Sequence, residues 1–180
     1  MTATIGLFFG STGGAGAAVA DLIKDLIDET GLATVDVHDI AFSEMKELEQ
    51  YDYLILGIST WNIGQLQDDW ALKFKQLDDI DLSGKPVAIY GMGDQYGYPD
   101  SFVDAIGILS EKVIERGAEP AGFQLVDDSY QFEYSAAVID GVFVGLALDD
   151  DNQSEMTTPR TQAWVATVLE DFKLAVPVPA

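Results

Sequence analysis

Short apolar runs alternate along this chain with segments of helical periodicity, and this alternation limits the possible folds more than any other feature. The runs 4–9, 51–58 and 86–90 are almost continuously apolar, which is typical of strands buried on both faces of a parallel sheet. Residues 19–27 and 102–113 instead repeat apolar side chains three and four positions apart, as amphipathic helices do. Repeated strand–helix–strand units predict an α/β fold whose parallel sheet carries helices on both faces.

The remaining elements follow the same alternation. Residues 34–38 and 123–126 read as the second and fifth strands, and 70–77 reads as a short helix. Gly117 is placed to end the helix of residues 102–113, and Pro159 is placed to begin the last helix.

The fifth strand is interrupted. A segment rich in Tyr, Phe and acidic residues, Asp127–Asp140, follows its first half. Asp140 and Gly141 form a tight-turn pair, after which Val142–Leu148 resumes as a strand. The sequence therefore predicts an insertion between two halves of one strand.

Composition sets further bounds. A chain of 180 residues suits one domain, which we expect over 1–175, with 176–180 as a loose tail. The absence of cysteine excludes disulfides, thiolate metal sites and a cysteine nucleophile. The sequence has no secretory leader and no apolar stretch near the roughly 20 residues that span a bilayer, so we expect a cytoplasmic protein.

The charge is strongly one-sided. Nine Lys and Arg stand against 31 Asp and Glu, for a formal net charge of -22. Such a surface repels nucleic acid and anionic membranes. The excess of acid is equally consistent with solubility, with a saline habitat and with steering toward basic partner proteins.

Ligands of open parallel sheets bind beyond the carboxyl ends of the strands, which directs attention to three turns. The first, residues 10–17, is Gly-rich and leads from a strand into a helix, where backbone N–H groups can hold an anion. It matches neither the Walker P-loop nor the Gly-x-Gly-x-x-Gly pattern. Phosphate binding and a plain tight turn both remain open for this segment alone.

The other two turns carry aromatic residues among small ones. Trp61 follows the strand of residues 51–58, and Tyr96 and Tyr98 lie in the Gly-rich turn 91–100. We expect Trp61 to project outward, and a planar ligand would explain an exposed indole. Each aromatic alone could simply pack on a loop, but three such turns at three strand ends point to one ligand site.

These segments together resemble the long-chain flavodoxins. The resemblance rests on Phe8-Phe9-Gly10-Ser11, Thr60-Trp61-Asn62-Ile63-Gly64, residues 91–98 and 145–153, in the family's order and spacing over nearly the whole chain. Residues 127–140 resemble the insertion of the long-chain class. The resemblance implies a three-layer sandwich with a five-stranded parallel sheet in the order 2-1-3-4-5. It also implies non-covalently bound FMN and a role as a low-potential one-electron carrier rather than an enzyme.

The resemblance also assigns site residues. Residues 11–16 would hold the phosphate, Trp61 and Tyr98 would cover the two faces of the flavin ring, and the Asn62–Ile63 peptide would face its N5. Backbone groups of 93–101 would meet the pyrimidine edge, and Asp149 would lie near the ribityl chain. The expected cofactor-binding residues are Ser11, Thr12, Gly13, Gly14, Ala15, Gly16, Ser59, Thr60, Trp61, Asn62, Ile63, Gly64, Gly93, Asp94, Gln95, Tyr98 and Ser101.

The phosphate turn departs from the family pattern Ser/Thr-x-Thr-Gly-x-Thr. Gly13 and Gly16 stand where the pattern has hydroxyls, and Ala15 replaces a typically polar residue. A hydrogen bond to a charged group contributes roughly 1.5–3 kcal/mol, so two lost donors predict FMN binding weaker by about two orders of magnitude or more.

Two alternatives remain beside the electron carrier. A flavin-free or weakly flavin-binding interaction module would explain the altered turn, and an FMN-dependent enzyme of the quinone-reductase kind would share the ring site. None of the nine basic residues lies in the three turns, while Asp68, Asp69, Asp94, Asp100 and Asp104 crowd the same end, as suits a low-potential carrier.

The other candidate groups point to no catalyst. We expect the single histidine, His38, to lie on a strand away from the three turns, and Asp149–Asp151 to be a solvated acidic turn rather than a metal site. The resemblance implies a monomer that forms transient complexes with basic redox proteins. Ferredoxin-NADP reductase, photosystem I, nitrogenase reductase and pyruvate oxidoreductase are candidates.

Overall fold

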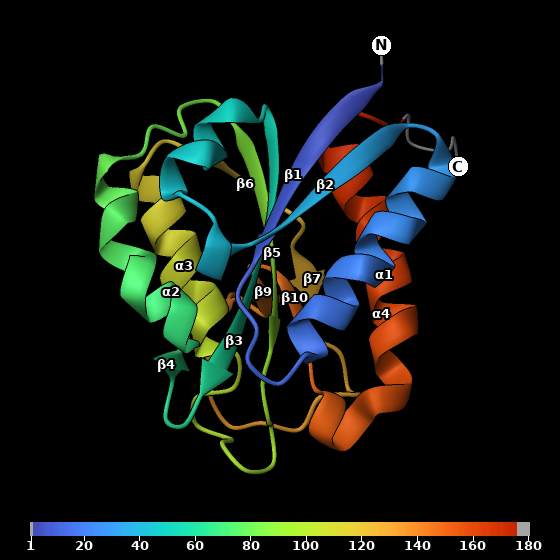
Figure 1. Cartoon of the computed structure of the whole chain (residues 1–180). Coiled ribbons are helices and arrows are strands. Elements are labelled where there is room, and N and C mark those ends of the chain that lie inside the picture. The colour runs from blue at the N-terminus through green and yellow to red at the C-terminus, as the bar shows by residue number, and fades with distance from the viewer. Residues whose placement is uncertain (1, 176–180) are drawn as a thin grey trace.

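A parallel sheet runs through the middle of the molecule with helices on both faces (Figure 1), in a computed structural model that describes residues 2–175. Its strands are, in chain order, β1 (Ala3–Phe9), β2 (Ala33–Asp39), β3 (Tyr53–Trp61), β5 (Pro86–Met92), β6 (Glu119–Ala121) and β10 (Leu146–Leu148). Across the sheet the order is β2-β1-β3-β5, with β6 and β10 both pairing with β5. All these pairs are parallel, so the predicted order 2-1-3-4-5 is confirmed, and two segments share its fifth place.

The helices form the two outer layers. On one face lie α1 (Ala15–Thr30) and α4 (Asp150–Asp171), side by side in Figure 1. On the other lie α2 (Asp68–Lys73), which continues as a 3-10 helix over Phe74–Asp79, and α3 (Asp104–Glu115). Two further 3-10 segments, Ile40–Phe42 and Met45–Gln50, follow β2.

Each face of the sheet has its own apolar core. Leu7 packs on the side of α1 and α4, whereas its neighbour Phe8 packs on the side of α3, and both are fully buried. Leu54 and Ile55 divide between the two cores in the same way. Because successive strand residues point to opposite faces, a strand covered on both sides must be continuously apolar, which explains the runs seen in the sequence.

The predicted first half of the fifth strand was wrong. It is β6, at Glu119–Ala121, and not 123–126. Gly122 redirects the chain immediately afterwards with φ of 71°, and its carbonyl accepts a hydrogen bond of 2.7 Å from Trp164 Nε1. A Cβ on Gly122 would lie 2.9 Å from that indole nitrogen, so this turn requires glycine.

The insertion accordingly runs from Gly122 to Gly145, longer than the predicted 127–140. It contains a small antiparallel sheet of β7 (Gln124–Leu125), β9 (Val142–Phe143) and β8 (Val138–Ile139), in that order. Asp140 and Gly141 join β8 to β9 with φ of 51° and 77°, which confirms the predicted tight turn.

Two helix starts and one short strand also differ from expectation. The last helical segment begins at Asp150 rather than at Pro159, and it is kinked at Gln153, whose φ of -136° and ψ of 47° are not helical. Asp149 caps its first turn by accepting from the N–H of Asn152 at 3.1 Å. The third helix begins at Asp104, since Val103 before it is left-handed, and Gly117 follows its end with φ of 94°. A strand of two residues, β4 (Gln65–Leu66), pairs antiparallel with the end of β3.

The predicted tail, 176–180, lies outside the described residues. Within 2–175 no helix is long and apolar enough to cross a membrane.

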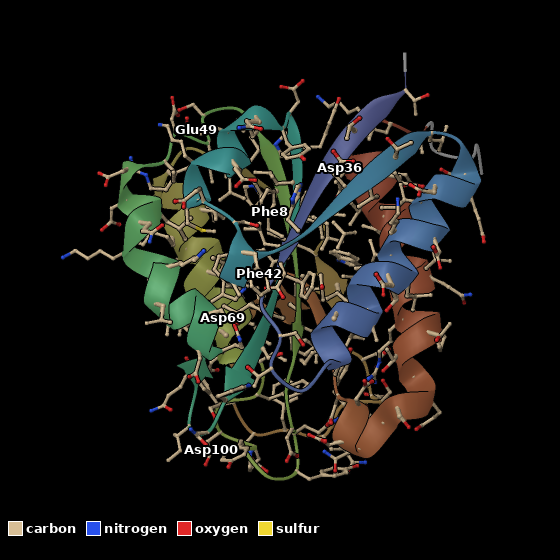
Figure 2. All side chains as sticks on the ribbon, viewed as in Figure 1. Phe8, Asp36, Phe42, Glu49, Asp69 and Asp100 are labelled. Atoms are coloured by element: carbon tan, nitrogen blue, oxygen red, sulfur yellow. The ribbon has the colours of Figure 1, made fainter. Side chains whose placement is uncertain are left out.

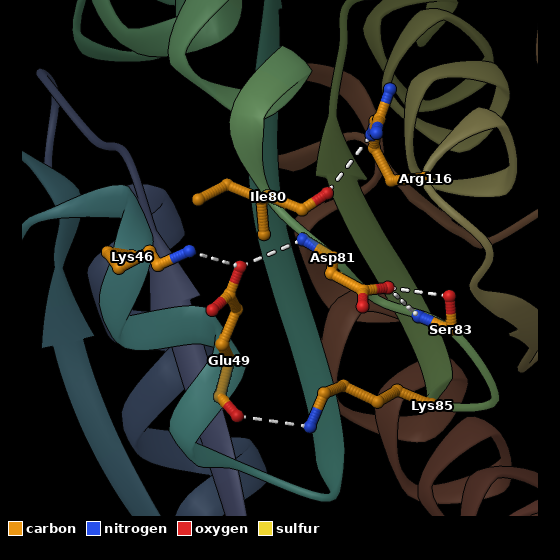
Figure 3. Close-up of polar contacts among 7 residues, drawn as sticks. All are labelled: Lys46, Glu49, Ile80, Asp81, Ser83, Lys85 and Arg116. Atoms are coloured by element: carbon orange, nitrogen blue, oxygen red, sulfur yellow. Dashed lines mark hydrogen bonds and ion pairs between the residues drawn. The ribbon is translucent and has the colours of Figure 1, made fainter.

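A polar network ties the connections together at the amino end of the sheet, opposite the ends of β3 and β5. Figure 3 shows Glu49 accepting hydrogen bonds from Lys46 Nζ and from the N–H of Asp81, both at 2.9 Å. Lys85 donates to the carbonyls of Glu49 and Tyr51. The N–H of Asp81, followed by Lys46, holds the pKa of Glu49 below its ordinary value.

We expect the stability contributed by the Glu49 carboxylate to depend on pH. A carboxyl whose pKa is lowered by folding stabilises the protein above its unfolded value, about 4.3, and loses this effect as pH falls through the folded value. Wild type should therefore be more stable than Glu49→Gln at pH 7, and the two should converge on acidification. Urea unfolding at a series of pH values measures the difference in the free energy of unfolding. Glu29→Gln, at an exposed position of α1, is the control. A gap that stays constant down to pH 3 would contradict this.

Candidate cofactor-binding site

A cavity of about 370 Å³ lies at the carboxyl edge of the sheet. It draws its walls from the turns after β1, β3, β5 and β10, which all end at this edge. The predicted site residues that line it are Ser11, Thr12, Gly13, Ala15, Gly16, Ser59, Thr60, Trp61, Asn62, Gly93, Asp94 and Tyr98. Three turns that are far apart in the sequence thus meet at one cavity.

The first turn presents backbone to the cavity. Gly14 caps α1 in a left-handed conformation, with φ of 87°, and its N–H donates to Ser11 Oγ at 3.1 Å. The following N–H groups belong to the first turn of the helix and have no intrahelical acceptor. The carbonyl of Gly16 accepts from the buried Tyr90 hydroxyl at 2.9 Å, which ties the turn to β5. Main-chain N–H groups and two hydroxyls arranged in this way can hold an anion.

Gly10 lets the turn pack closely against the start of α2. A Cβ on Gly10 would lie 2.2 Å from Gln67 Oε1 and 2.8 Å from the Trp70 ring. The N–H of Gly10 and the indole N–H of Trp70 both donate to the carbonyl of Gly57, at 3.1 and 2.7 Å. The turn after β1 is therefore packed against the segment that follows β4.

The second turn is the tip of a hairpin between β3 and β4. Thr60 pairs with Leu66 and Trp61 with Gln65, so residues 62–64 alone make the reversal. Asn62 and Gly64 have positive φ, 47° and 75°, and the Asn62 side chain donates to Gln65 Oε1 at 3.0 Å. Glycine is favoured at 64, because L side chains rarely adopt this φ and a Cβ would also lie 2.9 Å from Asp104 Oδ2.

Trp61 is half-buried and lines the cavity, so the expected outward orientation is only partly right. Its neighbour Ile63, at the hairpin tip, is 83% exposed. Thr60 Oγ1 accepts from the N–H of Ala105 at 2.9 Å and so caps α3. The hairpin is thereby anchored to a helix, while its tip faces solvent.

The third turn is shaped by Asp94. Its Oδ1 accepts from the N–H of Gly97 at 2.7 Å and of Tyr96 at 3.1 Å, and its carbonyl accepts from Tyr98 N–H at 3.0 Å. The bond from Gly97, with those from Asn152 and Tyr96, holds the pKa of Asp94 below its ordinary value. Tyr98 emerges from this turn 41% exposed, with its ring at the cavity.

A buried carboxylate holds the third turn in place. Asp149 is fully buried and accepts from the Gln95 N–H at 3.1 Å and from Gln95 Nε2 at 2.9 Å. It also accepts from Asn152, whose side chain reaches Asp94 at 2.8 Å. Gln95 Oε1 in turn accepts from the N–H of Gln131, in the insertion. This network joins β10, α4, the insertion and the turn that carries Tyr98.

Five predicted site residues do not line the cavity. Gln95 and Ser101 are buried beside it, Gly14 caps α1, and Ile63 and Gly64 form the hairpin tip. Their role here is to shape the walls rather than to face the space.

Three lining residues were missed: Met92, Asp150 and Asp151. The two carboxylates come from a fourth turn, after Leu148, which also ends a strand of the parallel sheet. The rule that directed attention to the other three turns could have found it, had the second half of the fifth strand been followed to its end.

The cavity is acidic. Its lining includes Asp94, Asp150 and Asp151 but neither Lys nor Arg. Burial, together with the neighbouring carboxylates of Asp94, Asp149 and Asp150, raises the pKa of Asp151. Asp69 and Asp100 lie toward the same end of the molecule, and Glu49 toward the other (Figure 2). Within 2–175 no group of three or more His, Asp or Glu side chains is arranged to hold a metal ion.

His38 does not line the cavity. Its ring stacks on Phe8 at 4.6 Å between centroids, and its Nε2 lies 2.7 Å from the Tyr51 hydroxyl, which donates to Asp36. Burial and the bond to Asp36 raise the pKa of Tyr51 to about 12. The histidine thus lies on β2, in a hydrogen-bonded chain with Asp36 and with Tyr51, which precedes β3. Its place on a strand away from the three turns confirms the prediction.

FMN suits the cavity in shape and in chemistry. Gly13 and Gly14 have open space where a Cβ would project, so the turn leaves room for a phosphate against its N–H groups. The rings of Trp61 and Tyr98 line the same cavity and can cover a planar heterocycle. The volume falls in the ordinary range for small-molecule sites.

Comparison with known proteins gives a consistent result. Residues 7–164 match the model of the family described as flavodoxin. The flavodoxin of a Nostoc species is 48% identical over 97% of this chain and all of its own length, and flavodoxin 2 of Escherichia coli is 42% identical over 93% and 96%. A mutant flavodoxin of Fusobacterium nucleatum, crystallised with flavin mononucleotide, superposes with a TM-score of 0.89 at 29% identity, over 96% of this chain and 98% of that one. This chain, with its insertion between β6 and β10, therefore belongs to the flavodoxin family and is of the long-chain type.

Proposed function

We infer that this chain holds FMN in the carboxyl-edge cavity and transfers single electrons between redox proteins, as an electron carrier and not an enzyme. One observation carries the inference: a Gly-rich helix start and two aromatic rings, from three separate turns, line the same cavity. The family membership supports it, and neither the flavin-free module nor the quinone-reductase alternative is favoured.

The cavity residues have distinct proposed roles. The turn 11–16 would bind the phosphate through N–H groups and the hydroxyls of Ser11 and Thr12. Trp61 and Tyr98 would cover the faces of the flavin ring, and main chain of 93–95 would meet its pyrimidine edge. Bound FMN supplies the redox chemistry. The carboxylates of Asp94, Asp150 and Asp151, with no cation among the lining residues, make added negative charge unfavourable and support a low potential.

The test is a titration of apoprotein with FMN, with riboflavin as the control, followed by quenching of flavin fluorescence. Stoichiometric FMN binding with strong quenching is expected, because both ring faces are covered. An affinity for FMN equal to that for riboflavin would mean that the phosphate turn contributes nothing. Failure to bind either flavin would rule out the carrier.

We propose that the partners are basic redox proteins, of the kind exemplified by ferredoxin-NADP reductase, photosystem I, nitrogenase reductase or pyruvate oxidoreductase. The support is electrostatic: the net charge is -22, and Asp68, at the start of α2, and Asp100, in the turn after Tyr98, are both exposed. The same charge opposes self-association and supports a monomeric carrier. We also propose that residues 1–175 form one domain and that the protein acts in the cytoplasm.

Association with a basic reductase should depend strongly on salt. Screening lengths fall to about 10 Å at 0.1 M ionic strength, so steering by the acidic rim is lost as salt rises. We expect the second-order rate constant for electron transfer to fall roughly tenfold or more between 10 and 300 mM salt. Asp68→Asn with Asp100→Asn should flatten this slope, whereas Glu29→Gln on α1 should not. A rate constant that is insensitive to ionic strength would rule out electrostatic steering.

A further inference from the structure

Thr12 is a hydroxyl in a turn that is otherwise poor in side-chain donors. Only Ser11 and Thr12 carry hydroxyls between Gly10 and Ala17, and both line the cavity. Thr12 Oγ1 lies 3.1 Å from Nε2 of Gln67, a residue 55 positions away that follows β4. A contact over this sequence distance reflects the tertiary structure and not the turn alone.

Gln67 is held rigidly. It is fully buried, its Oε1 accepts from the Trp70 N–H at 3.3 Å, and its Nε2 also donates to Asp69 Oδ2 at 2.9 Å. The donor N–H of Trp70 and the acceptor carboxylate of Asp69 leave only one orientation of the amide group that satisfies both ends. Nε2 must therefore face Thr12.

This orientation decides what the Thr12 hydroxyl can do. An amide nitrogen only donates, so Thr12 Oγ1 is the acceptor of this bond and its own proton must point elsewhere. Because Thr12 lines the cavity, the proton is available to an acceptor bound there. A hydroxyl that already accepts a hydrogen bond is also a better donor, since bonds in a chain polarise one another.

We propose that Thr12, oriented by Gln67, is a second side-chain donor beside Ser11 through which this chain recognises the phosphate of FMN, and that it takes the place of the hydroxyls absent at Gly13 and Gly16. Thr12 is then a binding residue and Gln67 a positioning residue that touches the ligand only through it. The inference rests on the proposed function, and it concerns discrimination between FMN and riboflavin, which differ only in the phosphate.

The experiment measures the affinity of apoprotein for both flavins. Thr12→Val keeps the shape of the side chain and removes the hydroxyl, and it should lower the ratio of FMN to riboflavin affinity by about tenfold to a hundredfold. Gln67→Met should lower the same ratio by less. The double variant should match Thr12→Val alone, because the two residues act through one hydrogen bond.

Two rescues and one control complete the set. Thr12→Ser retains the hydroxyl and should restore the ratio. Gly13→Thr adds a hydroxyl where a Cβ meets no neighbour, and it should restore the ratio lost in Thr12→Val. Thr34→Val is the control for replacing a threonine by valine, because Thr34 is an exposed residue of β2, at the other edge of the sheet.

The outcomes separate the inference from the function on which it rests. A wild-type chain that binds neither flavin would overturn both. Wild-type FMN binding that Thr12→Val leaves intact, or a loss equal for FMN and riboflavin, would overturn the inference alone. Far-UV circular dichroism and the riboflavin affinity serve as controls for folding, and both should be the same in every variant as in wild type.

Discussion

Replacing Trp61 or Tyr98 with alanine should weaken flavin binding by about tenfold to a hundredfold each, and by the same factor for riboflavin as for FMN. Both rings line the cavity, and stacking of an aromatic side chain on a planar heterocycle contributes about 1–3 kcal/mol. The effect should not distinguish the two flavins, because the rings contact the heterocycle and not the phosphate. Thr12→Val should therefore lower the affinity for FMN more than that for riboflavin, whereas the ring variants should lower both affinities equally.

Fluorescence titration of the apoprotein variants measures both affinities. Trp61→Phe and Tyr98→Phe keep a flat ring and should retain most of the affinity. Tyr134→Ala, an exposed tyrosine of the insertion that does not line the cavity, is the matched control and should bind as wild type does. Alanine variants that lose FMN but keep riboflavin would place the rings near the phosphate and contradict the proposed arrangement.

Asp149→Ala should be the most destabilising single replacement near the site. The carboxylate is fully buried and accepts hydrogen bonds from the main chain and side chains of both Gln95 and Asn152. Its loss removes the cap of α4 and leaves buried donors without an acceptor, so we expect a loss of about 3–5 kcal/mol in the free energy of unfolding. Flavin affinity should fall as well, because Gln95 belongs to the turn that carries Tyr98.

Urea unfolding of the apoprotein measures the effect, so that cofactor binding does not obscure it. Asp149→Asn keeps one acceptor oxygen and should lie between wild type and Asp149→Ala. Asp151→Ala, at an exposed position close by, should change the free energy of unfolding by about 0.5 kcal/mol at most, because attraction to the helix dipole is opposed by repulsion from the neighbouring carboxylates. Equal losses for Asp149→Ala and Asp151→Ala would mean that the buried network contributes nothing beyond a surface charge.

Much of this protein could be predicted from the sequence because the signals are local. A strand buried on both faces must be apolar at every position, and an amphipathic helix must repeat at 3.6 residues, so 4–9, 51–58 and 86–90 could be assigned without knowing their partners. Parallel strands connected by helices end at one edge of the sheet, which brought the turns at Gly10, Ser59 and Gly91 together in the prediction. The tight turn at Asp140–Gly141 depended on two adjacent residues and was confirmed.

Where two segments could compete for one place, only the tertiary structure decided. Three of the four residues 123–126 are apolar, as in a strand, but β6 takes the place beside β5 because the chain turns at Gly122, whose carbonyl accepts from Trp164 Nε1. The start of α4 depended on a cap, Asp149, whose carboxylate is buried by contacts with Gln95, 54 positions away. The bond between Thr12 and Gln67 likewise spans 55 positions. A local sequence pattern indicates whether a segment can form a strand, a helix or a turn. The hydrogen-bond partners of its buried polar groups are determined only when distant segments pack together.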